Sequence, residues 1–355
     1  MKIFFYINSL SRGGAERVMT NLAGEMSKRG HDCSLITTFR TNCEYTMSEA
    51  VKRYSLFEER PLSFFIRNVV TMLRLRQLLK KEKPDLLVTF MGEPNFRGII
   101  ATRGLPVKTV ISVRNTPESE YGTGMFARLA KILFRFASFT IFQTQDAKDW
   151  FPEAIQEKSA IIFNPVDKIF YESTRAISLR GIITVGRLVP QKNHRLLIRA
   201  YSKIANKTSE DLTIYGGGDA SSLKAYADSL GVGKRVHFPG QHPNISEVLS
   251  GGRVFVLSSD FEGMPNALME AMAVGVPCIS TNCPCGGPQM LFPDSIKSFL
   301  VPVGDEVMLS QRLLQVLSDS KTEEYLAAEC RKASLVFESS KIFDEWERVF
   351  ERCAK

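Results

Sequence analysis

The segment FEGMPNALME, residues 261–270, joins an apolar strand pattern to a helical pattern and decides how the second half of the chain folds. Proline suits the first position of a helix, because its missing N–H is one of those that have no intrahelical acceptor. We therefore expect a helix to begin at Pro265. The amides that follow would lack intrahelical acceptors and would face an anion, namely those of Asn266, Ala267 and Leu268.

Two carboxylates flank this predicted helix start. Glu270 lies roughly 6 Å further along the axis, at ~1.5 Å per residue, where it could accept hydrogen bonds from a ribose. Glu262 precedes the helix, in the turn that Gly263 and Met264 complete, and could bond hydroxyls of a different group. A carboxylate pair for general acid and base catalysis is the alternative. It fits less well, because a helix N-terminus between the two acids indicates a bound phosphate.

Short apolar runs alternate with longer helical patterns on both sides of this segment. Such alternation is typical of βαβ units in a parallel sheet. In the second half, the predicted strands are residues 181–185, 212–215, 253–258 and 276–280. In the first half they are residues 3–7, 34–38, 86–90, 109–113 and 140–143. The predicted fold class is therefore α/β, with doubly wound parallel sheets.

A turn-like Asn164-Pro165 pair separates the two sets of patterns. The chain has 355 residues, which is enough for two hydrophobic cores. We predict an N-terminal Rossmann-like domain over residues 1–165 and a C-terminal one over residues 166–340. Two such domains would face each other across a cleft, and that cleft would be the binding site.

A loop suited to phosphate follows the first predicted strand of the second half. This segment, GRLVPQKN, covers residues 186–193. Arg187 and Lys192 bracket it, and two cations at the carboxyl end of a strand suit a diphosphate. Asn193 is placed to cap the helix that follows. Two surface cations without a ligand are the alternative interpretation.

Glycine-rich loops follow two more predicted strands. Residues 8–16, NSLSRGGAE, place Gly14 near a helix start where exposed amides attract an anion, or they form a plain tight turn. Residues 215–219, YGGGD, place Gly216 where a ligand could lie against the backbone, or they form a flexible connection. Neither loop matches the GxGxxG dinucleotide fingerprint or carries the Lys-Ser/Thr of a P-loop.

Composition argues against several classes of protein. Seven cysteines without a framework indicate a reducing compartment, and neither they nor the four histidines show a metal-ligand spacing. The longest uncharged stretch, residues 271–293, is rich in Gly, Pro, Cys, Ser and Asn. The sequence therefore offers no run of the ~20 predominantly apolar residues that a spanning helix needs.

The net charge of +8 lies entirely in the first half of the chain. Residues 1–165 contain 24 Lys and Arg against 16 Asp and Glu, whereas residues 166–355 contain 22 of each. This excess suggests an anionic partner, such as lipid headgroups, a lipid-linked phosphate or nucleic acid, or else a solvated basic face. Residues 64–83 and 126–142 mix apolar and basic side chains, as in helices that rest on an anionic leaflet or core helices with basic outer faces.

Together, the loops resemble those of the retaining nucleotide-sugar glycosyltransferases of glycosyltransferase family 4, which have the GT-B fold. The resemblance covers nearly the whole chain. It rests on motifs that stand in the family's order, namely Gly13-Gly14-Ala15-Glu16, Arg187 with Lys192, Glu262-x7-Glu270 and Cys285-Gly286-Gly287-Pro288. It implies transfer of a hexose or N-acetylhexosamine from a UDP-sugar to a glycan acceptor in surface-polysaccharide synthesis. If the chain binds a membrane, the acceptor is expected to be linked to polyprenyl diphosphate.

The resemblance also implies roles for the site residues. Arg187 and Lys192 would stabilise the departing diphosphate, and since the sequence has no Asp-x-Asp we expect neither a metal nor another resident cofactor. Glu262 would bind the donor sugar and steady its oxocarbenium-like centre, and Glu270 would bind the ribose. Further donor contacts would come from Gly14, Gly216, Gly263, Met264, Pro265, Asn266, Ala267 and Leu268. The last helix, residues 341–355 with Trp346, would pack back on the first domain.

One departure from the family pattern affects the expected acceptor side. Many relatives carry a histidine after the strand predicted at residues 109–113, where this chain has Val113-Arg114-Asn115-Thr116. No catalytic histidine can therefore be carried over, and Arg114 or Asn115 would contact the sugar or the acceptor. Retention of configuration would proceed by front-face attack, with the departing phosphate taking the proton of the acceptor.

Two other classes of protein remain as alternatives. A nicotinamide-dependent oxidoreductase is disfavoured, because no GxGxxG follows Ile7 or Val185. A nucleic-acid-binding protein is suggested only by the basic first half. We expect instead a metal-independent transferase that binds no nucleic acid. We expect it in the cytoplasm, peripheral on the inner face of the plasma membrane.

Overall fold

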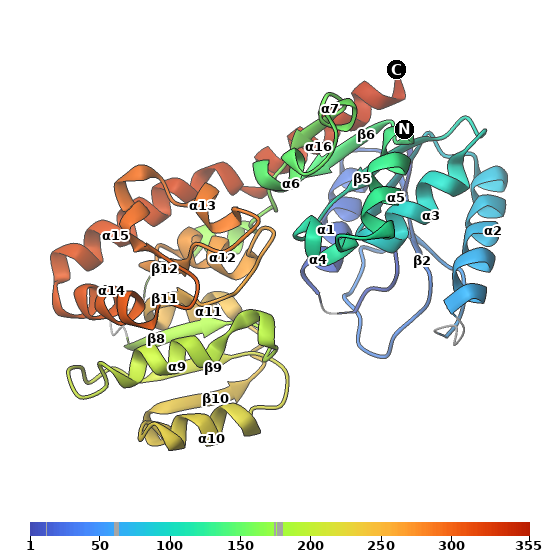
Figure 1. The fold of residues 1–355 in the computed structure, drawn as a ribbon. Coiled ribbons are helices and arrows are strands. Elements are labelled where there is room, and N and C mark those ends of the chain that lie inside the picture. The colour runs from blue at the N-terminus through green and yellow to red at the C-terminus, as the bar shows by residue number, and fades with distance from the viewer. Residues whose placement is uncertain (12, 60–63, 174, 176–179) are drawn as a thin grey trace. The chain divides into compact units, whose positions relative to one another are not determined.

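The computed structural model describes all residues except 12, 60–63, 174 and 176–179, and the chain divides into two compact units. Unit 1 comprises Met1–Pro165 and Ser340–Lys355, and unit 2 comprises Val166–Ser339. In each unit, helices flank a parallel sheet (Figure 1). The predicted α/β class is therefore confirmed.

Among the described residues, unit 1 forms a seven-stranded sheet in the order β3-β2-β1-β4-β5-β6-β7. Its strands are β1 (Lys2–Ile7), β2 (Asp32–Thr37), β3 (Lys52–Ser55), β4 (Leu86–Phe90), β5 (Lys108–Ser112), β6 (Phe139–Phe142) and β7 (Ser159–Ile161). Its helices are α1 (Gly14–Lys28), α2 (Phe64–Glu82), α3 (Gly92–Thr102), α4 (Pro117–Tyr121), α5 (Met125–Leu133), α6 (Gln145–Asp149), α7 (Glu153–Gln156) and α16 (Ser339–Ala354), with a 3₁₀ turn η1 (Phe134–Phe136).

Unit 2 repeats this plan with six described strands in the order β10-β9-β8-β11-β12-β13. They are β8 (Arg180–Val185), β9 (Leu212–Tyr215), β10 (Val236–Gly240), β11 (Gly252–Leu257), β12 (Cys278–Thr281) and β13 (Leu300–Val301). The helices are α8 (Lys168–Glu172), α9 (His194–Ser202), α10 (Ser221–Ser229), α11 (Ile245–Gly251), α12 (Asn266–Val274), α13 (Gly287–Leu291), α14 (Glu306–Ser318) and α15 (Ser320–Ser334). The 3₁₀ turns are η2 (Pro190–Lys192), η3 (Gly233–Arg235), η4 (Asp294–Phe299) and η5 (Leu335–Phe337).

In both sheets the strand order reverses beside the first strand, as in doubly wound folds. The reversal lies between β1 and β4 in unit 1 and between β8 and β11 in unit 2. Loops that follow such a pair of strands diverge to opposite faces and leave space for a ligand at the carboxyl edge of the sheet. The topology of unit 2 therefore predicts a ligand site at the loops after β8 and β11.

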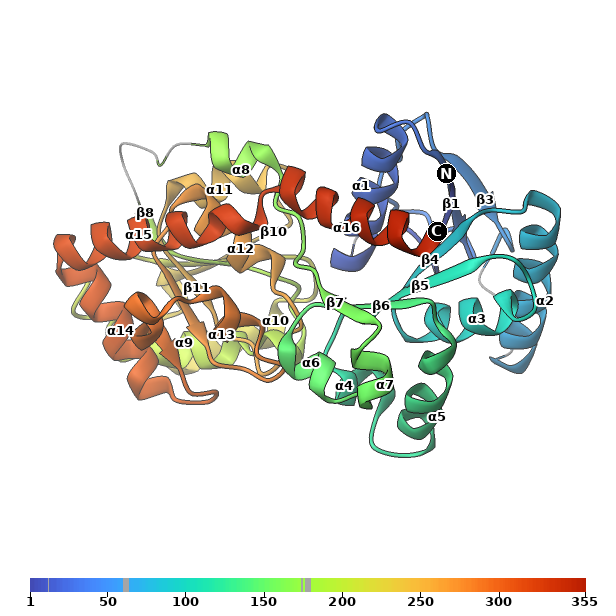
Figure 2. The ribbon, with the colours of Figure 1, turned by 90° about the horizontal axis from the view of Figure 1, so that it is seen from above.

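The C-terminal helix α16 contributes to the core of unit 1. Trp346 is fully buried, with its ring centroid 5.6 Å from that of Phe90 and 5.6 Å from that of Phe350. Polar contacts align the same helix with α1, because Arg29 donates hydrogen bonds to Asp344 at 2.7 Å and Glu347 at 2.6 Å. Figure 2 shows α16 running beside α1. This helix is thus a structural part of unit 1, although it follows unit 2 in the sequence.

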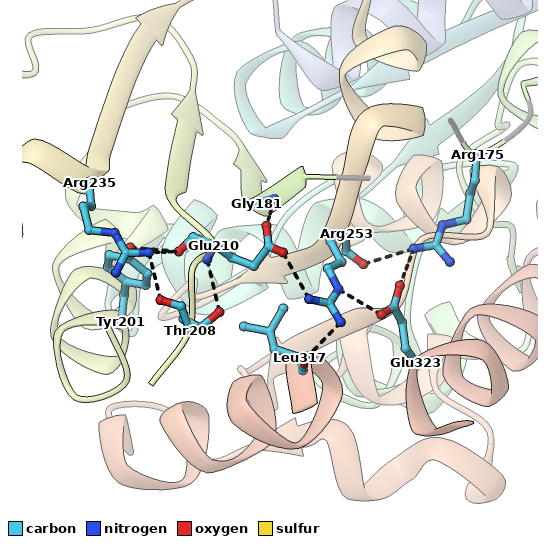
Figure 3. A network of polar contacts seen from close by, with 9 residues as sticks. All are labelled: Arg175, Gly181, Tyr201, Thr208, Glu210, Arg235, Arg253, Leu317 and Glu323. Carbon is cyan, nitrogen blue, oxygen red and sulfur yellow. Dashed lines mark hydrogen bonds and ion pairs between the residues drawn. The ribbon is translucent and has the colours of Figure 1, made fainter. Parts of the chain in front are cut away.

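A network of ion pairs holds the amino ends of two strands in unit 2 (Figure 3). Arg253, at the start of β11, donates to Glu210 at 3.1 Å and to Glu323 at 3.0 Å. Glu210 also accepts the amide of Gly181, near the start of β8, at 2.6 Å. Arg175 adds a second cation to Glu323 at 3.0 Å. The network fixes β8 and β11 at the edge opposite the loops that follow their carboxyl ends.

Candidate functional site

Lys192 and Glu262 meet at the carboxyl ends of β8 and β11. The Nζ atom of Lys192 lies 2.5 Å from Oε1 of Glu262, and the Lys192 and Glu262 side chains are only 17% and 9% exposed. The same carboxylate oxygen accepts a hydrogen bond from Oγ of Ser259 at 2.7 Å. A cation and a carboxylate separated by 70 residues in the chain thus share one polar site within unit 2.

Four hydrogen bonds join the two loops that carry this pair. The Gln191 side-chain amide donates to the Phe261 carbonyl at 2.9 Å, and the Asp260 amide donates to the Gln191 carbonyl at 2.9 Å. Asn193 donates to the Asp260 carboxylate at 2.6 Å. Ser258 Oγ donates to the carbonyl of Lys192 at 3.0 Å. Lys192 and Glu262 are therefore positioned by a bonded framework and not by their own attraction alone.

Asn193 caps the helix that follows the first of these loops. Its backbone is left-handed, with φ 41° and ψ 48°, and its side-chain oxygen accepts the Leu196 amide at 3.1 Å. Asparagine tolerates this conformation better than most residues and is a favoured cap. The cap predicted at Asn193 is confirmed, and the conformation turns the chain directly from Lys192 into α9.

His194 lies beside the pair and is held neutral. Its neutral ring, protonated at Nε2, donates to the Arg187 carbonyl at 3.2 Å. Burial, assisted by the nearby Lys192 cation, lowers the pKa of His194 from 6.5 to about 4. An imidazolium here would be desolvated and would face a like charge, so the fold selects the neutral form.

This shift predicts a pH dependence of stability. The unfolded chain binds a proton at His194 below pH 6.5, whereas the folded chain does so only near pH 4. The free energy of unfolding should therefore fall as the pH drops from 6.5 to 4, by up to about 3 kcal/mol from this residue. His194→Gln should show a shallower fall than the wild type when urea denaturation is compared at pH 7 and at pH 4.5. Parallel curves for the two proteins would contradict the assignment.

The helix that the sequence predicts to start near Pro265 is confirmed, with Pro265 as the residue before its first turn. Pro265 has extended backbone angles, φ −79° and ψ 99°, and α12 begins at Asn266. The amides of Leu268 and Met269 both donate to the Pro265 carbonyl, at 3.1 and 3.2 Å. The expectation that the Leu268 amide faces an anion is therefore corrected, because a carbonyl already accepts its hydrogen. Asn266 and Ala267, in the first turn and half-buried, remain as candidate anion contacts.

A neighbouring loop covers the turn before α12. The Glu262 amide donates to the Pro284 carbonyl at 3.0 Å. A Cβ atom on Gly287 would lie only 1.8 Å from the Gly263 carbonyl oxygen, so glycine is required where these loops cross. Met264 and Glu270 are both buried, at 6% and 5% exposure, within the same packed region. The loop that contains Cys285-Gly286-Gly287-Pro288 thus packs against the turn of Glu262 and holds it in place.

Gly216 follows β9, and its position explains why glycine is needed there. A Cβ atom at Gly216 would lie 1.8 Å from the carbonyl oxygen of Gly186. Its neighbour Gly217 accepts the Leu188 amide at 2.9 Å. The face of Gly216 that was expected to receive a ligand is therefore occupied by the backbone of the loop that bears Arg187. Gly216 shapes the site by allowing this close approach.

Replacing Gly216 by alanine should displace that loop. Overpacking of this kind typically lowers the free energy of unfolding by about 1–3 kcal/mol, and here the obstacle is a backbone carbonyl that cannot rotate away. Gly251→Ala, at the end of α11, is the matched control, because its added Cβ would meet nothing within 4 Å. Chemical denaturation of both variants tests the difference. Equal stability of the two variants would show that the loop yields without cost.

Two further residues of the expected site, Arg187 in unit 2 and Gly14 in unit 1, lie at the surface of their own units. Arg187 is exposed, and among the described residues its guanidinium has no hydrogen-bond or ion-pair partner. Gly14 begins α1 in unit 1 and is also exposed.

Arg114 does not stand open to a ligand, which corrects the expectation of a sugar or acceptor contact there. It is 8% exposed, donates to the Asn164 side chain and stacks 4.5 Å from the centroid of the Phe90 ring. Burial lowers the pKa of Arg114 to about 9. The Asn115 side-chain oxygen accepts the adjacent Thr116 amide at 2.9 Å. Arg114 therefore has an interior role in unit 1.

Ser259, Asp260 and His194 are the polar residues of this site that sequence reasoning missed. Ser259 and Asp260 are the second and third residues after the buried strand β11, a position where polar side chains reach the carboxyl edge of a sheet. Their position after a predicted strand could therefore have identified both residues as candidate site residues. His194 gave no comparable signal, because only the packed structure shows its burial.

The described residues offer neither a metal cluster nor a helix that could cross a membrane. No group of three or more His, Cys, Asp or Glu side chains there could hold a metal ion. In the same part of the chain, each helix is too short or too polar to cross a bilayer.

Two family models match the chain, one in each half. Residues 12–168 match the model of Glycosyltransferase Family 4, and residues 173–333 match that of Glycosyl transferases group 1. The two matches fall almost wholly within unit 1 and unit 2 respectively.

Curated relatives and solved structures extend this similarity over the full length. The chain is 26% identical to the GalNAc-α-(1→4)-GalNAc-α-(1→3)-diNAcBac-PP-undecaprenol α-1,4-N-acetyl-D-galactosaminyltransferase of Campylobacter jejuni, over 98% of this chain and 97% of the relative. It is 28% identical to the UDP-Gal:α-D-GlcNAc-diphosphoundecaprenol α-1,3-galactosyltransferase of Escherichia coli, over 75% of this chain and 74% of the relative. The crystal structure of Anabaena HepE with UDP and glucose matches with a TM-score of 0.83, over 99% of each chain at 18% identity, which shows a shared fold.

Proposed function

Because the chain belongs to the glycosyltransferases of the GT-B fold, with a family 4 domain in unit 1 and a group 1 domain in unit 2, we propose that it transfers a hexose or N-acetylhexosamine from a UDP-sugar to a lipid-linked glycan. The acceptor would be carried on polyprenyl diphosphate, and the product would enter surface-polysaccharide or glycan synthesis. Transfer would retain the configuration of the sugar and need no metal. Residues 166–340 would bind the donor, and residues 1–165 the acceptor.

The observation that carries this proposal is the Lys192–Glu262 pair beside the first turn of α12. A leaving nucleotide diphosphate develops negative charge, which a partly buried cation and helix-start amides stabilise. A sugar presents hydroxyl groups that a fixed carboxylate can accept. One site therefore offers a cation for the phosphate and a carboxylate for the sugar, 2.5 Å from each other.

We assign the individual roles from these positions. Arg187 and Lys192 bind the diphosphate, together with the backbone amides of Asn266 and Ala267. Glu262 binds the sugar hydroxyls, and Ser259 orients its carboxylate through the 2.7 Å hydrogen bond. When the donor enters, Lys192 exchanges its bond to Glu262 for a phosphate oxygen, which frees the carboxylate oxygen for a hydroxyl.

The remaining donor contacts follow from the same arrangement. Glu270, further along α12, would accept hydrogen bonds from the ribose. Gly263, Met264 and Pro265 form the turn that places Glu262, and Gly14 is proposed as a further donor contact. Gly216 acts by holding the Arg187 loop in place, as its contact with Gly186 indicates.

The proposed reaction exchanges one bond to the anomeric carbon for another on the same face. The bond from that carbon to the diphosphate oxygen breaks, and the electron pair remains on the phosphate. The acceptor hydroxyl oxygen forms the new bond, and its proton passes to the departing phosphate oxygen. Arg187 and Lys192 stabilise the charge that develops, and Glu262 steadies the positive charge on the sugar ring.

The named relatives support the donor and acceptor classes. The Escherichia coli relative is named for a UDP-sugar donor, and both it and the Campylobacter jejuni relative are named for acceptors on undecaprenyl diphosphate. An acceptor of that kind would place the enzyme at the cytoplasmic face of the membrane, and the basic first half of the chain would favour an anionic leaflet. A nucleic-acid partner has no comparable support.

A donor screen with purified protein tests the proposal. UDP release is measured from a panel of UDP-sugars with and without a lipid-linked glycan acceptor, and each reaction is repeated with EDTA. We expect one donor to be used, at a rate that the acceptor increases and that EDTA leaves unchanged. Glu262→Gln should lose most of this activity. If no donor releases UDP with acceptors present and UDP fails to stabilise the fold, the donor-site assignment is wrong.

A further inference from the structure

The helix α5 and the turn η1 present apolar side chains outward from unit 1. Five large apolar residues in this segment are between 40% and 77% exposed, namely Met125, Phe126, Leu129, Ile132 and Phe136. We call these five side chains the α5 face. The side chains of this segment that pack against the rest of unit 1 include the small residues Ala127 and Ala130. Phe134, which is 1% exposed, is also buried there. The helix thus directs its small side chains toward the core and exposes its larger apolar side chains to solvent.

Helical spacing gathers the α5 face into one stripe. Met125, Leu129, Ile132 and Phe136 follow one another at intervals of four, three and four residues, which keeps them on one side of a helix. A surface helix ordinarily directs such a stripe toward the core. Here the core-facing positions are occupied by other residues, so the outward stripe needs a different explanation.

Cations border the α5 face, and acidic residues are absent from this stretch of sequence. Arg128 and Arg135 are exposed, and the chain contains no Asp or Glu from residue 121 to residue 145. Arg103, at the end of α3, lies 4.2 Å from the centroid of the Phe136 ring. Lys131 lies 4.0 Å from the centroid of the Trp150 ring. The apolar stripe is thereby edged by positive charge.

The basic helix α2 differs from α5 in how its side chains are used. Its Leu75 and Leu79 are buried in the core of unit 1. Arg74 donates to the Leu56 carbonyl at 2.5 Å, and Arg76 donates to the carbonyls of Ala101 and Arg103 at 2.8 and 2.6 Å. These cations therefore hold the fold together. Among the described side chains of the two basic segments, α5 with η1 therefore has the larger exposed apolar face.

We infer that the α5 face inserts into the headgroup region of an anionic lipid bilayer and seats unit 1 on the membrane. Apolar side chains on one side of a helix, bordered by Lys and Arg, are typical of helices that lie in the interface. Anionic headgroups would neutralise the bordering cations. A symmetric contact between two copies through the same face fits less well, because it would bring the cations of both copies together.

This inference builds on the proposed lipid-linked acceptor, because a membrane seat would place unit 1 where that acceptor lies. Its test is independent of catalysis. The full chain, without donor or acceptor, is floated with vesicles of phosphatidylcholine alone and with vesicles of phosphatidylcholine and phosphatidylglycerol in equal parts. We expect binding to the anionic vesicles, weakened by salt. Phe126→Ser/Ile132→Ser should reduce it by about tenfold or more, since two inserted side chains are lost.

Val69→Ser/Leu73→Ser is the matched control, because these side chains on α2 are also exposed, at 36% and 56%. It should bind vesicles like the wild type. Circular dichroism of both variants checks the fold, and the mass in solution checks for dimers. As a second measurement, Phe126→Trp should show a blue shift of fluorescence with anionic vesicles, whereas Leu73→Trp should not.

Three outcomes would overturn the inference. They are unchanged vesicle binding in the α5 variant, equal losses in both double variants, and loss of a dimer in the α5 variant without loss of vesicle binding. Transfer to a water-soluble acceptor is measured separately. If that activity is present and vesicle binding is absent, the membrane inference alone fails.

Discussion

Turnover should fall about 100-fold when Lys192 is replaced by alanine, while the donor still binds. Removing one group that stabilises a developing negative charge commonly costs this much, and Lys192 is the partly buried cation at the proposed leaving group. The loss should appear mainly in kcat, because the charge on the diphosphate grows as its bond to the sugar breaks. Initial rates of UDP release over a range of donor concentrations provide the measurement.

Two further variants separate chemistry from stability. Lys192→Ala leaves Glu262 buried beside Ser259 without its cation, which can destabilise the fold by itself. Lys192→Ala/Glu262→Gln removes that unpaired charge and should restore stability without restoring turnover. Lys297→Ala is the matched control, since its ion pair with Asp294 lies on the surface of the same unit. A Lys192→Ala enzyme with wild-type turnover would remove Lys192 from the mechanism.

Replacing Trp346 by alanine should destabilise unit 1 by about 3–5 kcal/mol, the range for removing a large aromatic side chain from a core. Trp346 is fully buried between Phe90 and Phe350, so its loss leaves a cavity between α16 and the sheet. The remaining tryptophan, Trp150, also lies in unit 1, and its fluorescence reports the unfolding of that unit in guanidinium. We expect an earlier transition for unit 1.

The effect should be confined to the unit that α16 completes. Arg348→Ala changes an exposed residue of the same helix and should leave the transition nearly unchanged. Trp346→Phe should lose much less stability than Trp346→Ala, because most of the volume remains. If Trp346→Ala melts like the wild type, α16 is not a structural part of unit 1.

The strands could be predicted only where both faces are covered. The nine strands expected from apolar runs correspond to inner strands, such as β1 and β11. The four missed strands, β3, β7, β10 and β13, are those at the edges of the two sheets. Inner strands of parallel sheets are buried on both faces and read as continuous apolar runs. Edge strands are short and partly exposed, and β10 even contains Pro239, so no such run marks them.

The proposed donor-site loops were located from the sequence, whereas some of the contacts expected within them differ in the structure. The carboxyl ends of predicted strands located the segments around Arg187, Lys192 and Glu262, and the cap at Asn193 followed from local preferences. The role of Gly216 and the free amide at Leu268 were expected differently. Gly216 lies against the Gly186 carbonyl, which approaches from another part of the chain, and the Leu268 amide donates to the Pro265 carbonyl.

The sequence by itself determined the α/β class, the two parallel sheets and the loops in which the polar residues gather. These features depend on apolar periodicity and on local backbone preferences, which are written along the chain. Only the tertiary structure decided that Lys192 meets Glu262, that Arg114 is buried and that α5 exposes its larger apolar side chains. Such features depend on which segments, distant in the sequence, pack together and share hydrogen-bond partners. The spacing of residues along the chain does not determine these contacts.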